Sequence, residues 1–102
     1  MGLTSTLSQD GGTLAIRLGK RFDFSDHDAF REAYRQHDVT KISIIINFGQ
    51  TEYLDSAALG MLLVLRERAG GDDANIVLES CRSPVQQIMD ITRFERLFTI
   101  RA

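Results

Sequence analysis

The sequence is poor in cysteine, proline, tryptophan and histidine. It has one cysteine, one proline and no tryptophan among 102 residues. A single cysteine cannot form an intramolecular disulfide, so we expect a fold held by its hydrophobic core and a reducing, cytoplasmic compartment. No stretch of about 18 consecutive apolar residues occurs, so no membrane-spanning helix is predicted. The net charge of −2 lacks the basic excess of nucleic-acid-binding proteins.

The motifs of common enzyme and cofactor sites are also missing. The two histidines, His27 and His37, both lie in the first predicted helix, and nothing in the sequence places them near Ser56. One cysteine and two histidines form no zinc-binding spacing. Neither a Gly-x-Ser-x-Gly elbow nor a glycine-rich nucleotide loop is present. We therefore expect no catalytic site, no metal and no cofactor, which favours a binding protein over an enzyme.

The sequence does contain enough apolar residues for one core. Hydrophobic residues make up 43% of the chain, and 102 residues suffice for one domain but not for two. Because no linker, repeat or low-complexity segment interrupts the chain, we expect a single domain over residues 1–102. Hydrophobic periodicity predicts four strands, and the β-branched run near 42–46 is typical of a strand buried on both faces. The predicted strands lie near residues 3–7, 14–18, 42–46 and 75–81.

Two helices are predicted between these strands. Ser25, with Asp28 three positions later, is expected to cap the first helix, which ends near Asp38. The second helix begins at Asp55. It is expected to end at Gly70-Gly71, because glycine readily adopts the positive φ that a helix C-terminus needs.

A third helix has the strongest start signal in the chain. Ser83 is the expected cap, Pro84 the first helical residue, and Gln86 completes a capping box. The residues after this helix are expected to close against the core as a tail. Two strand–helix–strand units imply parallel neighbours joined by right-handed crossovers. The predicted fold is α/β, with a mixed, mostly parallel sheet, an antiparallel N-terminal hairpin and three main helices.

The loop from Asn47 to Asp55 and the helix entrance at Ser56 fall at the carboxyl ends of the predicted strands, where sites in such sheets gather. Residue chemistry leaves two interpretations of Ser56 open. The serine is an N-cap, or a first-turn residue behind an Asp55 cap. Alternatively it is a phosphorylation site, because a helix N-terminus favours an anion. The helix is apolar on most faces, which predicts burial, and its solvent-facing remainder near Met61 is a candidate docking patch.

The segment NFGQTEYLDSAALGMLLVLRERAGG resembles the signature of STAS domains, the family of bacterial anti-sigma factor antagonists. Asp55, Ser56, Leu59 and Gly60 match the family's motif. The resemblance continues through NIVLES and SPVQQIMDITRFERLF, and GKRFDFSDHDAF is similar to the family's entry to the first helix. The similarity thus covers nearly the whole chain.

Four positions depart from the family pattern. Asn47 stands where an aspartate is usual and Gly49 where a serine is usual. Ala57 and Ala58 replace the Ser-Gly pair that follows the phospho-acceptor.

The resemblance implies a STAS-like fold and a binding switch. Ser56 matches the family's phospho-acceptor, which implies that the unphosphorylated protein binds an anti-sigma factor, often itself a serine kinase, and that phosphorylation releases it. A metal-dependent serine phosphatase restores binding. The resemblance implies a set of partner-binding residues around the acceptor, namely Asp23, Asn47, Asp55, Ser56, Ala57, Ala58 and Met61.

Two alternatives remain open. The chain is a STAS subunit bound constitutively in a lipid-transport or stress-sensing complex, or it is a small α/β enzyme or nucleotide-binding domain. Transport subunits of the family often carry threonine or another residue at the acceptor position, so Ser56 counts mildly against the first alternative. The second lacks every motif expected of an enzyme or nucleotide-binding domain. We expect a cytoplasmic monomer that binds neither nucleic acid nor membrane.

Overall fold

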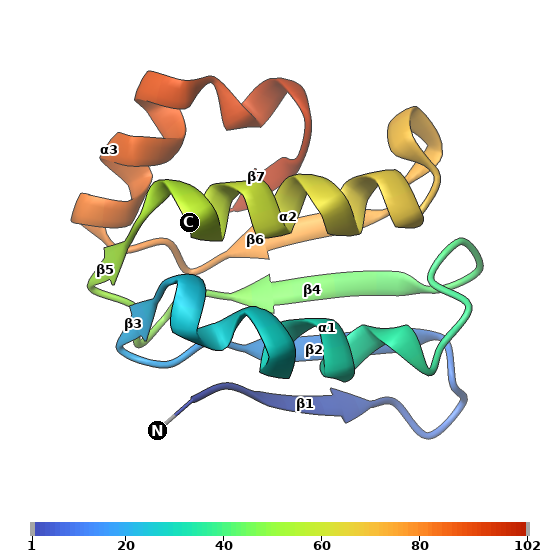
Figure 1. Ribbon diagram of the computed structural model, residues 1–102. Coiled ribbons are helices and arrows are strands. Elements are labelled where there is room, and N and C mark those ends of the chain that lie inside the picture. The colour runs from blue at the N-terminus through green and yellow to red at the C-terminus, as the bar shows by residue number, and fades with distance from the viewer. Residues whose placement is uncertain (1, 102) are drawn as a thin grey trace.

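A five-stranded sheet is the frame of the structure, a computed structural model that describes residues 2–101 (Figure 1). The strands run in the order β1–β2–β4–β6–β7. β1 pairs antiparallel with β2, and the other neighbouring pairs are parallel. This confirms the predicted mixed sheet with an N-terminal hairpin. The bounds are Thr4–Leu7 (β1), Thr13–Arg17 (β2), Ser43–Asn47 (β4), Ile76–Glu79 (β6) and Thr99–Arg101 (β7).

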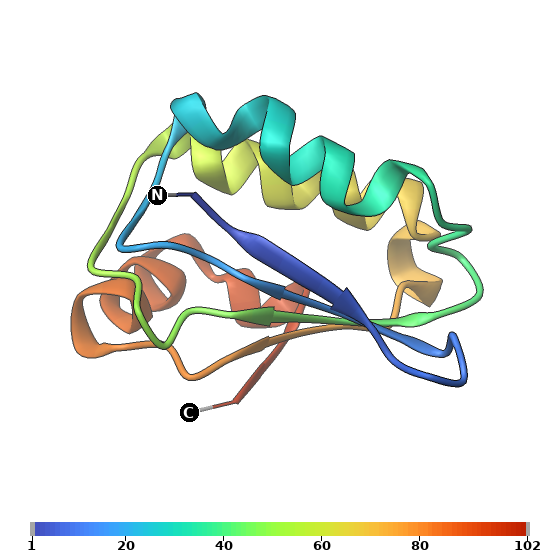
Figure 2. The same ribbon diagram turned by 90° about the horizontal axis from the view of Figure 1, so that it is seen from below.

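Two helices, α1 (His27–Arg35) and α2 (Ser56–Arg68), lie side by side on one face of the sheet (Figure 2). In β4, Ile44 and Ile46 are fully buried on this face, whereas Ile45 between them is only half-buried. The prediction of a strand buried on both faces is therefore wrong, because α1 and α2 cover the same side.

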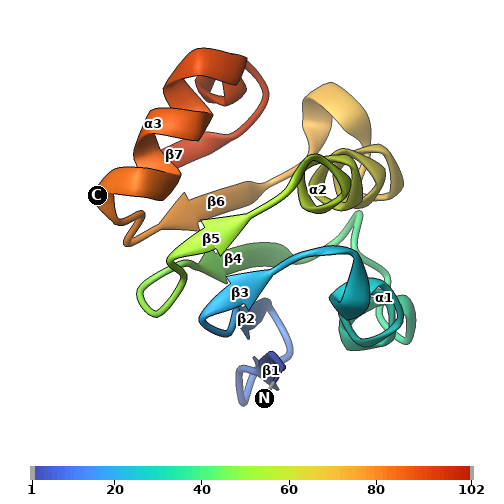
Figure 3. The same ribbon diagram turned by 60° about the vertical axis from the view of Figure 1, so that its left-hand side comes forward.

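A second, two-stranded sheet was not predicted. β3 (Arg21–Phe22) and β5 (Tyr53–Leu54) pair in parallel next to the start of α1 and α2 (Figure 3). Each strand has two residues, which is too short to show a period-two pattern in the sequence. The small sheet matters because it fixes the residues that follow it, at the entrances of both helices.

The first helix begins differently from the prediction. A 3₁₀ turn, η1 (Phe24–Asp26), precedes α1, and Asp23 caps this turn. Ser25 is not the cap, because its own N–H and hydroxyl both donate to the Asp23 carboxylate. The α-helix also ends earlier than expected, at Arg35.

The C-terminal region differs in two respects. α3 (Ser83–Thr92) starts with Ser83 as its first residue, and Arg82 occupies the cap position without a side-chain bond. The predicted capping box is therefore wrong: the Gln86 side chain donates to Asp90 instead. The tail closes on the core as predicted, since Phe98 is buried, but it ends in the edge strand β7, which was not predicted.

α2 ends where the sequence predicted, but its solvent-facing apolar residues are not the ones expected. Gly70 follows α2 with a φ of 116° and Gly71 with a φ of 62°, the conformation for which glycine was expected. Met61 is only 7% exposed, so the docking patch does not centre on it. The exposed apolar side chains of α2 are Leu63 and Val64, the latter 55% exposed.

One buried hydrogen bond joins the loops at the carboxyl end of the sheet. Thr51 is the fully buried polar residue among residues 2–101, and its hydroxyl donates to the Gly19 carbonyl at 2.8 Å. Next to it, the Glu52 N–H donates to the Lys20 carbonyl at 2.8 Å. These bonds hold the segment before β3 against the segment before β5, and so position both short strands.

We predict that Thr51→Val destabilises the domain although it keeps the side-chain volume. The substitution leaves the buried Gly19 carbonyl unpaired, which costs roughly 1–3 kcal/mol. Thr99→Val, an exposed change on β7, is the matched control and should shift stability by less than about 0.5 kcal/mol. Denaturant unfolding of both variants measures this. Equal stability of Thr51→Val and the parent would show that the Thr51–Gly19 hydrogen bond does not stabilise the domain.

Candidate functional site

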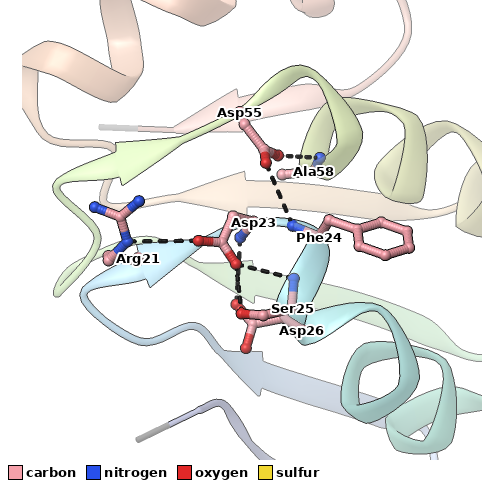
Figure 4. A network of polar contacts seen from close by, with 7 residues as sticks. All are labelled: Arg21, Asp23, Phe24, Ser25, Asp26, Asp55 and Ala58. Atoms are coloured by element: carbon pink, nitrogen blue, oxygen red, sulfur yellow. Dashed lines mark hydrogen bonds and ion pairs between the residues drawn. The ribbon is translucent and has the colours of Figure 1, made fainter.

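The candidate site lies where β3 and β5 end. Asp23 follows β3 and Asp55 follows β5, so the parallel pairing of the two strands brings both carboxylates to one corner (Figure 4). We call this the acidic corner and define it as Asp23, Asp26 and Asp55. It stands at the carboxyl end of a parallel pair, as sites in α/β folds usually do.

Asp55 has two structural contacts. Its Oδ1 accepts from the Ala58 N–H at 2.8 Å, which caps α2. Its Oδ2 accepts from the Phe24 N–H at 3.4 Å, across 31 residues of sequence. One carboxylate therefore joins the start of α2 to the turn that precedes α1, and both of its oxygens are engaged (Figure 4).

Asp23 organises the other half of the corner. Its Oδ1 accepts from the Ser25 hydroxyl at 2.5 Å and from the Ser25 N–H at 3.0 Å, and its Oδ2 lies 3.4 Å from Arg21 Nε. The Ser25 hydroxyl is the main reason that the pKa of Asp23 is lowered. The Arg21 guanidinium also stacks 4.2 Å over the Tyr53 ring. The half-buried corner thus places the Asp23 carboxylate, whose pKa is lowered, beside a cation–π pair.

Ser56 is the first residue of α2 and is exposed. Of the two structural interpretations, the structure supports a first-turn residue behind an Asp55 cap. No protein hydrogen bond of the Ser56 hydroxyl is found within residues 2–101. The hydroxyl is therefore accessible and takes no part in capping the helix.

The other predicted partner-binding residues on α2 differ in how exposed their side chains are. Ala57 is half-buried next to Ser56, but Ala58 is fully buried on the inner face of α2, so its side chain cannot contact a partner. Met61 is nearly buried as well. The sequence could not separate these positions, because the helix is apolar on several faces and only its packing shows which face is covered.

Asn47 belongs to a different contact set from the acidic corner. Its amide oxygen accepts from the Gly49 N–H at 2.8 Å, and its amide nitrogen donates to Glu79 at 3.4 Å. A Cβ at Gly49 would lie 2.9 Å from the Asn47 oxygen, so the two residues are matched to each other. An amide oxygen makes this turn as a carboxylate would.

Sequence reasoning missed Arg21, Phe24 and Tyr53, which line the corner. No sequence signal marks them, because their roles depend on the pairing of two-residue strands. In the described part of the chain no group of three or more His, Cys, Asp and Glu side chains is placed to hold a metal ion. None of the helices within residues 2–101 combines the length and apolar character that a membrane crossing needs.

Solved structures with this fold include proteins of known role. Against the anti-sigma factor antagonist SpoIIAA in its unphosphorylated form the TM-score is 0.77 at 17% identity, covering 98% of this chain and 88% of that one. Against Bacillus SpoIIAA in its phosphorylated form the TM-score is 0.67 at 15% identity, with 98% and 91% covered. A sulfate transporter family protein of Wolinella succinogenes gives 0.75 at 12%, with 94% and 80% covered. At these identities the likeness shows the fold.

Sequence comparison shows the family. The STAS domain model matches residues 5–102. A STAS-domain-containing protein of Pseudomonas aeruginosa is 44% identical over 100 residues, which cover 98% of this chain and 99% of the relative. These matches confirm the resemblance drawn from the DSxxLG segment, and the fold agrees with them. The chain therefore belongs to the STAS domain family.

Proposed function

We propose that this STAS domain is an anti-sigma factor antagonist that binds its partner when Ser56 is unphosphorylated and releases it when Ser56 carries a phosphate. The observation that carries the proposal is the accessible Ser56 hydroxyl on the first turn of α2, behind a cap that Asp55 provides. Because the hydroxyl is not needed to cap the helix, its modification removes no cap from the folded domain.

The electrostatics of the site support a local switch. A phosphate adds about −1.5 to −2 charges, and the free N–H groups of a helix N-terminus tolerate an anion. The added charge stands beside the acidic corner, so it increases the negative charge of a surface that a partner would have to cover. The domain keeps its fold, and the interface carries the energetic cost.

The partners follow from the family. The binding partner is an anti-sigma factor that is itself a serine kinase, and a metal-dependent serine phosphatase returns the protein to its binding state. The solved forms of SpoIIAA, unphosphorylated and phosphorylated, support such a cycle on this fold. In this proposal the protein is a cytoplasmic monomer and a substrate of both enzymes, without catalytic activity of its own.

A comparison of two alanine variants tests whether the Ser56 side chain contributes to the stability of the domain. Asp55→Ala removes the cap of α2 and should cost about 0.5–2 kcal/mol. Ser56→Ala should cost less than about 0.5 kcal/mol, because no bond is lost. Denaturant unfolding curves measure both. A larger loss for Ser56→Ala than for Asp55→Ala would mean that the serine is mainly structural.

Ser56 should be the main phosphorylation site. The protein is incubated with the anti-sigma factor kinase and ATP, and the modified residue is located by mass spectrometry. Ser56→Ala should abolish incorporation and Ser83→Ala should not. Phosphate found on Ser25 or Ser83, with Ser56 unmodified, would overturn the assignment. Stable capture of a partner with no phosphorylation would favour the constitutive complex subunit instead.

We predict that Ser56→Asp weakens binding of the anti-sigma factor without rearranging the domain. An unpaired charge buried in an interface costs about 2–5 kcal/mol, which is roughly 30-fold to several thousandfold in affinity. Aspartate carries one charge, so it should mimic phosphate incompletely. Titration calorimetry gives the affinity, and amide NMR shifts should be confined to residues near 47–60.

Ser83→Asp is the matched control, because Ser83 is likewise the exposed first residue of a helix. It should bind with unchanged affinity. Shifts of the Ser56→Asp spectrum that extend over β2 and β6 would show a rearranged sheet and contradict the local account.

A further inference from the structure

A groove of about 310 Å³ runs between α1 and α2 on the face away from the sheet. We call it the α1–α2 groove. The nearly buried side chains of Phe30, Tyr34 and Met61 form its base, and the exposed side chains of Phe24 and Val64 form its walls. Its lining is almost entirely apolar, and its volume is at the lower end of the range of small-molecule pockets.

Gly60 marks where the groove is open. A Cβ added at Gly60 would meet no atom within 4 Å, so the packing of the chain itself does not require a glycine here. Glycine in the middle of a helix costs about 1 kcal/mol relative to alanine. Because packing within the protein does not require a glycine at this position, the absent side chain leaves room for another molecule to approach the helix backbone.

One end of the groove is basic. Arg31 lines it, and Arg68 borders the adjoining hollow beside Val64. Burial raises the pKa of the Tyr34 hydroxyl, and the positive charges of Arg68 and Arg31 oppose that rise only in part. Neither arginine forms an ion pair within residues 2–101. One guanidinium group thus lines the groove itself, and a second lines the hollow that shares Val64 with it.

Acidic side chains lie near both arginines: Asp28 and Glu32 line a hollow with Arg31, and Glu67 lines one with Arg68, but none of them forms an ion pair with either arginine within residues 2–101. On α1, Glu32 pairs with Arg35, and Asp28 lies against the His27 ring. On α2, the Glu67 carboxylate points toward the turn after the helix, 3.7 Å from the position of a Cβ on Gly71. The unpaired guanidinium groups therefore keep their capacity for an external anion.

We propose that the α1–α2 groove binds a small amphiphilic carboxylate, with its hydrocarbon body along Phe24, Gly60 and Val64 and its carboxylate at Arg31. The volume suits a medium-chain alkanoate or an arylalkanoate. Arginine recognises a carboxylate through two parallel N–H donors. This proposal does not depend on phosphorylation of Ser56, and its test uses the unmodified protein.

The test is an NMR titration of the protein with sodium decanoate below its critical micelle concentration. We expect saturable amide shifts around residues 24–34 and 57–64, with a Kd on the order of 0.1–1 mM. Decanol and decyltrimethylammonium carry the same chain with a neutral and a cationic head, and both should bind at least about tenfold more weakly.

Three variants locate the site. Gly60→Leu fills the groove with a better helix former, so it should fold and lose the saturable shifts. Arg31→Gln should weaken decanoate binding at least about tenfold. Arg35→Gln is the matched control: it lies one turn further along α1 and pairs with Glu32, so binding should be unchanged.

Several results would overturn the proposal. Equal binding of the three head groups would show a merely apolar surface, and shifts that do not saturate would show no site. Binding to anionic phospholipid vesicles but not to monomeric decanoate would indicate a membrane surface. Loss of anti-sigma factor binding in Gly60→Leu, with no decanoate binding by the parent, would make the groove a protein-docking surface.

Discussion

The two hydrogen bonds of the Asp55 carboxylate join the entrances of the two helices at the candidate site. One caps α2 and the other fixes the turn at Phe24. That turn begins at Asp23 and carries one wall of the α1–α2 groove, and the capped helix presents Ser56. A single side chain therefore links Ser56, the acidic corner and the groove. Because Asp55 caps α2, the Ser56 hydroxyl is left without a structural hydrogen bond within residues 2–101, as the proposed phosphorylation requires.

The resulting surface has two regions of opposite charge on neighbouring helices. The acidic corner lies at the start of α1 and α2, and the unpaired guanidinium groups of Arg31 and Arg68 lie further along the same helices. A phosphate on Ser56 increases the negative charge of one region and leaves the other unchanged. The two proposed functions of this face therefore respond to different charges, and substitutions can separate them.

The sequence was informative where a pattern repeats and uninformative where a contact is unique. Alternating residues such as Leu14 and Ile16 predicted the main strands, and Gly70 marked the end of α2. The DSxxLG segment led to the family. Two-residue strands show no alternating pattern, so β3 and β5 could not be predicted. The proximity of Asp23 and Asp55, which depends on the pairing of these strands, could not be predicted either. The exposure of Val64 in place of Met61 also depends on how α1 lies against α2, which no local pattern specifies.

The contacts that build the acidic corner join residues far apart in the chain: Phe24 reaches Asp55 across 31 positions, and Gly19 reaches Thr51 across 32. Each requires a whole strand–helix–strand unit to close before it can form. The surroundings of Ser56 therefore exist only in the folded domain. A kinase that recognises this corner reads a conformational epitope, and a short peptide spanning the serine would lack the features by which such an enzyme selects it.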